Sequence, residues 1–203
     1  ARMALATGDQ RSDEFRHGFP FVGGRLWLDL LNTVVSDGVA SRDLLAEPGG
    51  PELWRKAAGI DAPLPASGSA ALSALRELLR PAVALLRGQK ALSAELLERI
   101  NGLLAEVSLR SRLVAEDGSL RLESWLDPGA AGPAGAVAEN FARFVCEAEP
   151  ERLKHCSNPS CSLVFYDGGK NNTRRWCSMN LCGNRDKVAR YRARRRESPK
   201  TEG

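Results

Sequence analysis

Four cysteines near the C-terminal end constrain the fold of this chain more than any other feature. Four residues separate Cys156 from Cys161, four separate Cys177 from Cys182, and fifteen lie between the two pairs. Each pair can close a tight turn, and folding of the linking loop would bring four sulfur atoms to about 2.3 Å from one ion. Four thiolates leave no open coordination position, so the spacing predicts one structural Zn2+ per chain.

Disulfides and buried free thiols are the alternatives for these cysteines. Two pairs with matched spacing argue against isolated thiols. The first residues contain no apolar segment typical of an export signal, so we expect a cytoplasmic, reducing location, which disfavours disulfides. No run of about 18 apolar residues occurs, and we expect no membrane partner. The fifth cysteine, Cys146, lies outside the cluster, and we interpret it as a free thiol.

Residues 1–150 are expected to form a mainly α-helical body. Pro51 suits the first turn of a short helix, Ser93 suits the residue before a longer one, and Pro81 is expected to kink a helix. Apolar residues recur at helical spacing in three further segments, residues 75–86, 96–107 and 137–145.

Turn signals indicate short β-hairpins within this body. Asp117-Gly118 lies between two alternating segments, the pattern of a two-residue hairpin turn. Gly23-Gly24 separates two apolar runs and could also turn a hairpin, but the residues after Arg25 follow helical spacing. There we expect a short strand that leads into a helix. The predicted fold class is therefore mainly α with short β-hairpins, an α+β body.

Residues 151–203 are expected to form a separate C-terminal zinc finger. Residues 162–177 contain two strand-like segments around a glycine-rich turn, and the arginine-rich run 186–196 contains no helix breaker. A knuckle, a hairpin and a helix at the last cysteine together describe a treble-clef-like finger. Zinc is needed because a segment of this size cannot be stabilised by apolar burial alone.

Charge is distributed unevenly along the chain. Residues 151–203 hold 13 of the 29 Lys and Arg residues and 5 of the 25 Asp and Glu residues, a net charge of +8, whereas residues 1–150 carry −4. A basic tail on an acidic body predicts an anionic partner for the tail, although a solvated basic face is the alternative. The expected phosphate contacts are Arg174, Arg175, Arg185, Lys187, Arg190, Arg192, Arg194, Arg195 and Arg196.

Asn184 and Arg185 directly follow the last cysteine. Side chains of these two types pair with adenine and guanine edges, and both residues lie in the first turn of the expected helix. The same side chains can instead brace the zinc knuckle, and the sequence leaves both roles open. RNA competes with DNA as the partner because three aromatic side chains could stack on bases: Phe165, Tyr166 and Trp176.

The segment RRWCSMNLCGNRDKVARYRARRR resembles the CGNR zinc finger, which is named for the residues at Cys182–Arg185. The segments LWLDLLNTV (26–34) and LRELL (75–79) resemble the ABATE domain, which precedes this finger in bacterial proteins. The resemblance extends over nearly the whole chain. It implies a stress-induced transcription regulator whose finger binds DNA and whose body is a sensor or a dimerisation module.

Asp29, Asn32 and Arg76 are polar residues within otherwise apolar segments of the body. Together they could frame a pocket for a small-molecule ligand. The alternative is that they cap helices and form a buried hydrogen-bond network.

Several classes of enzyme are disfavoured by the sequence. The chain has two histidines, and it lacks the zinc-protease, phosphate-loop and deaminase motifs, so we expect no enzymatic activity. A DNA-binding regulator is the preferred interpretation, and a homodimer fits it because one small finger buries little DNA surface. A zinc-stabilised module that binds protein or RNA, without DNA specificity, is the alternative.

Overall fold

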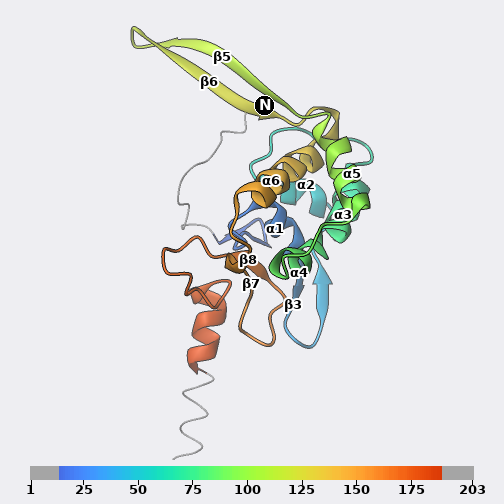
Figure 1. Ribbon diagram of the computed structural model, residues 1–203, viewed down its shortest axis with the longest axis vertical. Coiled ribbons are helices and arrows are strands. Elements are labelled where there is room, and N and C mark those ends of the chain that lie inside the picture. Colours follow the sequence, from blue (N-terminus) through green and yellow to red (C-terminus); the bar gives the residue numbers. More distant parts are fainter. Residues whose placement is uncertain (1–13, 189–203) are drawn as a thin grey trace, which may run out of the picture.

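The computed structural model describes residues 14–188 and confirms a mainly α fold with short antiparallel hairpins (Figure 1). Ser93 caps its helix as predicted, since its hydroxyl accepts a hydrogen bond from the Leu96 amide at 3.2 Å. Pro81 separates two helices where a single kinked one was expected. The helices are α1 (Leu26–Leu31), α2 (Gly50–Ala57), α3 (Gly68–Leu79), α4 (Ala82–Arg87), α5 (Ala94–Leu104) and α6 (Pro133–Glu147).

Each strand of the described residues pairs with one neighbour in an antiparallel hairpin. Asp117 and Gly118 both have positive φ, 51° and 77°, as their two-residue hairpin turn requires. Gly23-Gly24 leads from a strand into α1, as expected, and turns no hairpin. The paired strands are β1 (Phe15–Arg16) with β2 (Phe19–Pro20), β3 (Val34–Ser36) with β4 (Ser41–Asp43), β5 (Ser108–Glu116) with β6 (Ser119–Asp127), and β7 (Leu153–His155) with β8 (Val164–Tyr166).

The pairing of β8 differs from the sequence-based expectation. We expected its partner strand after the glycine-rich turn, within the segment 162–177. The partner is instead β7, which precedes Cys156, so the first pair of cysteines lies in the loop that joins the two strands. A three-residue strand carries too little periodicity for its partner to be read from the sequence.

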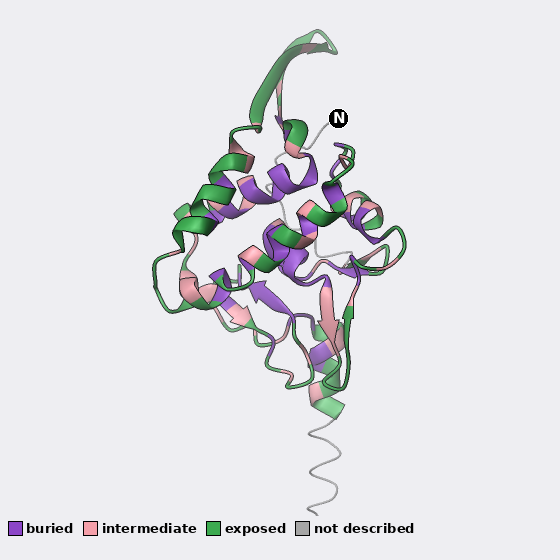
Figure 2. Cartoon of the chain, turned by 90° about the vertical axis from the view of Figure 1, so that its right-hand side faces the viewer, coloured by how far each residue is buried: buried purple, intermediate pink, exposed green. Residues whose placement is uncertain are grey.

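The core of the body forms around Trp27 on α1. Its ring is fully buried and contacts Phe141 and Phe144 of α6, with ring centroids 5.2 and 5.1 Å apart. Aromatic pairs at these distances add to the free energy gained by burying apolar surface. Figure 2 shows the buried residues gathered where the helices cross, whereas the β5–β6 ribbon is exposed along most of its length. None of the helices within residues 14–188 has the length and apolar character to cross a bilayer.

The body and the finger share this core. Leu153, Val164 and Tyr166 of the β7–β8 hairpin are buried in the same apolar cluster as α1, α3 and α6. The Tyr166 ring lies edge-on to Phe144, with centroids 5.3 Å apart. The hairpin of the finger is therefore packed against the body, and the two segments are joined by more than their covalent linkage.

Candidate zinc centre and basic surface

The four predicted cysteine ligands converge on one point. Their Sγ atoms all lie within 4.8 Å of one another, with 3.8 Å between Cys161 and Cys177 and 3.7 Å between Cys177 and Cys182. Four sulfur atoms at about 2.3 Å from a tetrahedral zinc ion are about 3.8 Å apart, so the donor set fits this metal. Within residues 14–188 no histidine or carboxylate joins the group. The centre is a closed structural site for one zinc ion.

Local backbone geometry positions each pair of cysteines. Cys156 follows β7 directly, and its amide donates to the Leu163 carbonyl at 3.0 Å, which closes the first knuckle. In the second pair, the Ser178 hydroxyl accepts hydrogen bonds from the amides of Asn180 and Leu181. This cap starts the helical turn that contains Cys182, and residues 184–188 continue as α-helix. The zinc centre therefore fixes the direction of the helix that follows it.

Two hydrogen-bond donors point at the sulfur atoms. Asn158 Nδ2 lies 3.4 Å from Cys182 Sγ, and the Cys177 amide lies 3.4 Å from Cys156 Sγ. Such donors stabilise the negative charge of ligating thiolates. Asn158 was missed at the level of sequence, and its place inside the first knuckle is the signal that could have identified it.

The acidity of the thiols shows why the cluster needs a cation. A hydrogen bond from Cys177 lowers the pKa of Cys161 to about 5. The same hydrogen bond, together with burial, raises the pKa of Cys177, and burial raises the pKa of Cys182 to about 11. Ionisation of one thiol makes ionisation of the neighbouring thiols less favourable, because like charges repel at this distance. A cluster of four thiolates therefore depends on the positive charge of a bound metal.

Arg174 is directed into the protein, which corrects the expectation that it contacts phosphate. Its guanidinium donates to the carbonyls of Val22, Trp176 and Cys177, at 2.9 Å for Val22 and 3.1 Å for Trp176. Its Cζ lies 4.3 Å from the centroid of the Phe165 ring. Burial lowers the pKa of Arg174. The side chain therefore ties the second cysteine pair to the body at Val22.

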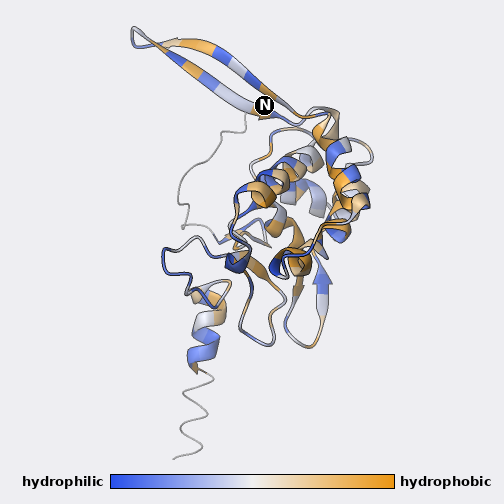
Figure 3. Ribbon diagram, viewed as in Figure 1, coloured by the Kyte–Doolittle hydropathy of each residue, from blue (hydrophilic) through white to orange (hydrophobic). Residues whose placement is uncertain are grey.

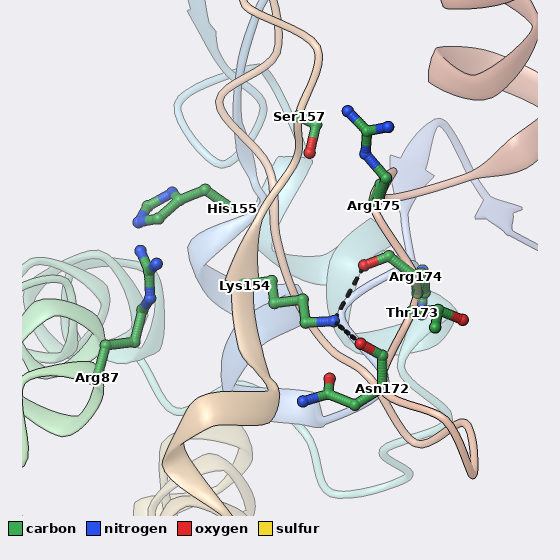
Figure 4. A pocket seen from close by; sticks show the side chains of 8 residues that line it. All are labelled: Arg87, Lys154, His155, Ser157, Asn172, Thr173, Arg174 and Arg175. Carbon is green, nitrogen blue, oxygen red and sulfur yellow. Dashed lines mark hydrogen bonds between the residues drawn. The ribbon is translucent and has the colours of Figure 1, made fainter.

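A basic hollow of about 570 Å³ lies between α4 and the finger (Figure 4). Arg87 is on the body side and points toward His155, while Arg175 lies across the hollow on the finger. Burial and the nearby Arg87 lower the pKa of His155, so its imidazole is neutral at pH 7. The lining contains no carboxylate; it consists of Arg87, Lys154, His155, Ser157, Asn172, Thr173, Arg174 and Arg175.

The cations around this hollow divide into internal and exposed groups. Lys154 Nζ bonds Asp167 Oδ2 at 2.9 Å and two backbone carbonyls, so it organises the loop after β8. Arg87 and Arg175 are exposed, and Arg175 lies over the Trp176 ring. Sequence analysis missed Arg87 because it lies on the body, far from the cysteines along the chain.

The first turn of the helix after the zinc centre is exposed. Asn184 Nδ2 donates to the Asn180 carbonyl at 3.4 Å, and the donors to sulfur come from elsewhere. Arg185 and Lys187 are exposed on the same turn. The other expected phosphate contacts, Arg190, Arg192, Arg194, Arg195 and Arg196, lie outside the described residues.

Asp29, Asn32 and Arg76 are buried, but each takes its own partners. The Asp29 carboxylate accepts a hydrogen bond from the Gly23 amide at 2.8 Å, and burial raises its pKa to about 7. The Asn32 amide exchanges two 2.9 Å hydrogen bonds with the backbone of Val164 on β8. Their hydrogen bonds match the buried-network alternative.

Arg76 completes this network from α3. Its guanidinium binds both carboxylate oxygens of Asp43 at 2.6 Å and the Thr33 hydroxyl at 2.9 Å. Such a bidentate ion pair satisfies the hydrogen-bond donors and the charge of a guanidinium whose residue is only 4% exposed. Asp43 and Thr33 were missed at the level of sequence because they lie 33 and 43 residues from Arg76 along the chain.

Sequence models of two families match this chain. Residues 152–195 match the CGNR zinc finger. Residues 24–148 match the ABATE family, described as "Putative stress-induced transcription regulator". No curated protein matches the chain. The ABATE match covers more than half of the 203 residues, and the CGNR match contains all four clustered cysteines. The chain therefore belongs to the ABATE family and carries a CGNR zinc finger after its ABATE domain.

Proposed function

We propose that this protein is a non-enzymatic, cytoplasmic transcription regulator that binds DNA through its zinc finger. The observation that carries the proposal is the arrangement of exposed cations around a rigid metal centre. Arg175 immediately precedes Trp176 and the second cysteine pair, and Arg185 and Lys187 follow that pair on the helix that the zinc centre directs. Cations in fixed positions neutralise phosphates at a low entropic cost.

The aromatic side chains of the finger favour duplex DNA over single-stranded RNA. Stacking on bases requires exposed rings, but Phe165 and Tyr166 are buried in the structure. Trp176 is half-buried, and Arg175 covers its ring with Cζ 5.2 Å from the centroid. The surface is thus better suited to contacts with phosphates than to stacking, and Asn184 and Arg185 are exposed next to it.

The body has a regulatory role in this proposal. Asn32 of the ABATE domain bonds β8 of the finger, and Arg174 of the finger bonds Val22 near α1. A change in α1 would therefore act directly on the hairpin that carries the first knuckle. The finger is treble-clef-like, with a knuckle between two strands and a helix after the last ligand.

A salt series with zinc-loaded protein and random duplex DNA tests this function. The logarithm of affinity should fall with the logarithm of salt at a slope near −0.9 per phosphate contact. Removing two contacts with Arg185→Ala and Lys187→Ala should flatten the slope by about 1.8. The matched control, Arg110→Ala with Arg112→Ala, removes the same charge from β5 at the opposite end of the molecule (Figure 1).

The outcome of this comparison separates local contacts from net charge. An equal loss of slope in both double variants would show that the finger has no specific role. No binding to DNA at about 50 mM salt would refute the proposal and favour a zinc-stabilised module that binds protein. Tighter binding to single-stranded RNA than to duplex DNA would favour the RNA alternative.

A further inference from the structure

The β5–β6 hairpin projects from the body as an exposed ribbon (Figure 1). Hydrophobic and hydrophilic residues alternate along it (Figure 3), and the strand register gathers leucines on one face. Both strands have nine residues, and on one face their antiparallel register pairs only apolar or serine side chains across the ribbon. The exposed leucines are Leu109 at 63%, Leu113 at 65%, Leu120 at 70% and Leu122 at 65%. From the base to the tip, the layers of this face are Leu109–Leu126, Ser111–Ser124, Leu113–Leu122 and Ala115–Leu120. In the base layer Leu126 is only 6% exposed, so Leu109 is the side chain of that layer that faces solvent.

The opposite face of the ribbon is charged and satisfied within itself. Arg110 pairs with Asp127 at 2.5 Å, and Arg112 pairs with Glu123 at 2.8 Å. Arg121 pairs with Glu116 at 3.0 Å and with Glu123 at 2.9 Å. Three cations and three anions leave this face without net charge. The charges of this face are therefore paired within the ribbon, and the leucines of the opposite face are the side chains that remain exposed to solvent.

A ribbon of this kind needs a covering layer to be stable. Two-stranded sheets are marginally stable in water unless their apolar face packs on another element. Strands of nine residues, with two strands side by side, give a face of about 30 Å by about 10 Å. A contiguous apolar patch of a few hundred Å² is as large as the largest patch on a typical monomer, and such patches are often functional.

We propose that the apolar face of this ribbon packs against the same face of a second copy of the chain. The two ribbons then form a four-stranded sandwich, with the charged faces outward. The face contains leucine, serine and alanine without any charge, so a second copy introduces no unpaired ion. The dimer through this face would form whether or not the finger binds DNA.

The order of layers is self-complementary, as a two-fold interface requires. The serine layer lies between two leucine layers. It can face the serine layer of the other copy whether the second ribbon runs in the same direction or in the opposite one. In both cases the exposed leucines nearest the serine layer, Leu109, Leu113 and Leu122, face leucines of the other copy. Ser111 Oγ and Ser124 Oγ hydrogen-bond each other at 2.8 Å, which uses one of their two hydroxyl hydrogens. The other hydroxyl can donate to the serine layer of the facing copy.

The size of the interface sets the expected strength of the dimer. Two faces of about 300 Å² bury less than the total of about 1,200 Å² that is typical of a stable complex. We therefore expect a reversible dimer with a micromolar dissociation constant. The wild-type, zinc-loaded chain should change from monomer to dimer between about 1 and about 100 micromolar in sedimentation equilibrium.

Two double variants on neighbouring cross-strand pairs, one on each face of the ribbon, test the apolar face directly. Leu113→Thr with Leu122→Thr removes a leucine layer but retains strand propensity and a favourable cross-strand pair. The dissociation constant should rise by about 100-fold or more. The matched control, Arg112→Thr with Glu123→Thr, changes the adjacent cross-strand pair on the charged face, and it should leave the constant within about twofold.

Chemical cross-linking identifies the layer at the centre. In a Cys146→Ser background with zinc bound, a short bismaleimide should link two copies of the Ser111→Cys variant. The Ser119→Cys variant, on the charged face of the same ribbon, should remain unlinked. A wild type that is monomeric at about 100 micromolar would overturn the proposal. A dimer that the threonine pair does not weaken, or that links only through Ser119→Cys, would overturn it as well.

Discussion

Removal of the Asn32 side chain should destabilise the whole protein, because this residue joins the body to the finger. Asn32 is 1% exposed, and its amide makes both a donor and an acceptor bond with the backbone of Val164. The Asn32→Ala variant leaves that N–H and that C=O without their partners. Each buried unsatisfied group costs about 1–3 kcal/mol, so the expected loss of unfolding free energy is about 2–6 kcal/mol.

Urea unfolding of zinc-loaded protein measures this loss. The Asn32→Asp variant preserves the size of the side chain and can accept from the Val164 amide, but it cannot donate to the Val164 carbonyl. It should therefore also be destabilised, which separates hydrogen bonding from packing. The control Asn101→Ala removes an exposed amide on α5 and should change stability by less than about 0.5 kcal/mol.

The reasoning about Asn32 would be refuted by a loss below about 0.5 kcal/mol, since two unsatisfied backbone groups cannot cost so little. It would also be refuted by two separate unfolding transitions in the wild type. Two transitions would mean that the body and the finger unfold independently, despite the core that Leu153, Val164 and Tyr166 share with the body.

Two further outcomes follow from the same structure. Metal analysis should find one zinc per chain in the wild type and much less zinc in the Cys177→Ser variant. Chelation should abolish hydrogen-exchange protection after residue 167 but spare β8, because Asn32 hydrogen-bonds that strand. A full complement of zinc in the variant, or a uniform loss of protection along the chain, would contradict these expectations. Burial raises the pKa of Asp29 from 3.8 to about 7, so the folded state binds the proton of this carboxyl more tightly than the unfolded state does. The resulting contribution to the free energy of unfolding is fully present below about pH 4 and is lost as the pH rises through 7. Between about pH 5.5 and about pH 8, the wild type should therefore lose about 2 kcal/mol relative to Asp29→Asn, and parallel pH profiles would contradict the assignment.

The zinc ligands could be predicted from sequence because their geometry is local. Each pair of cysteines closes its own turn, so the spacing alone specifies the knuckles. The longer helices could be predicted for a similar reason, since their apolar residues repeat within a few turns. The ribbon followed from the Asp117-Gly118 turn between alternating segments.

The roles of the basic residues could not be read in the same way. Arg174 and Arg175 are neighbours of identical type, yet one lies over Phe165 and the other over Trp176. Side chains of consecutive residues in an extended chain point in opposite directions. Which of the two arginines points into the protein depends on the position of Val22, whose carbonyl accepts a hydrogen bond from Arg174. Contacts between distant segments decide this, and the sequence pattern does not contain them.

Hydrogen exchange of the zinc-loaded protein, with and without duplex DNA at about 50 mM salt, tests the central claim most directly. DNA should slow exchange in residues 174–188, where Arg175, Arg185 and Lys187 surround the zinc centre, and should leave the β5–β6 ribbon unchanged. Unaltered exchange across residues 174–188 at saturating DNA, or protection confined to the body, would contradict the account.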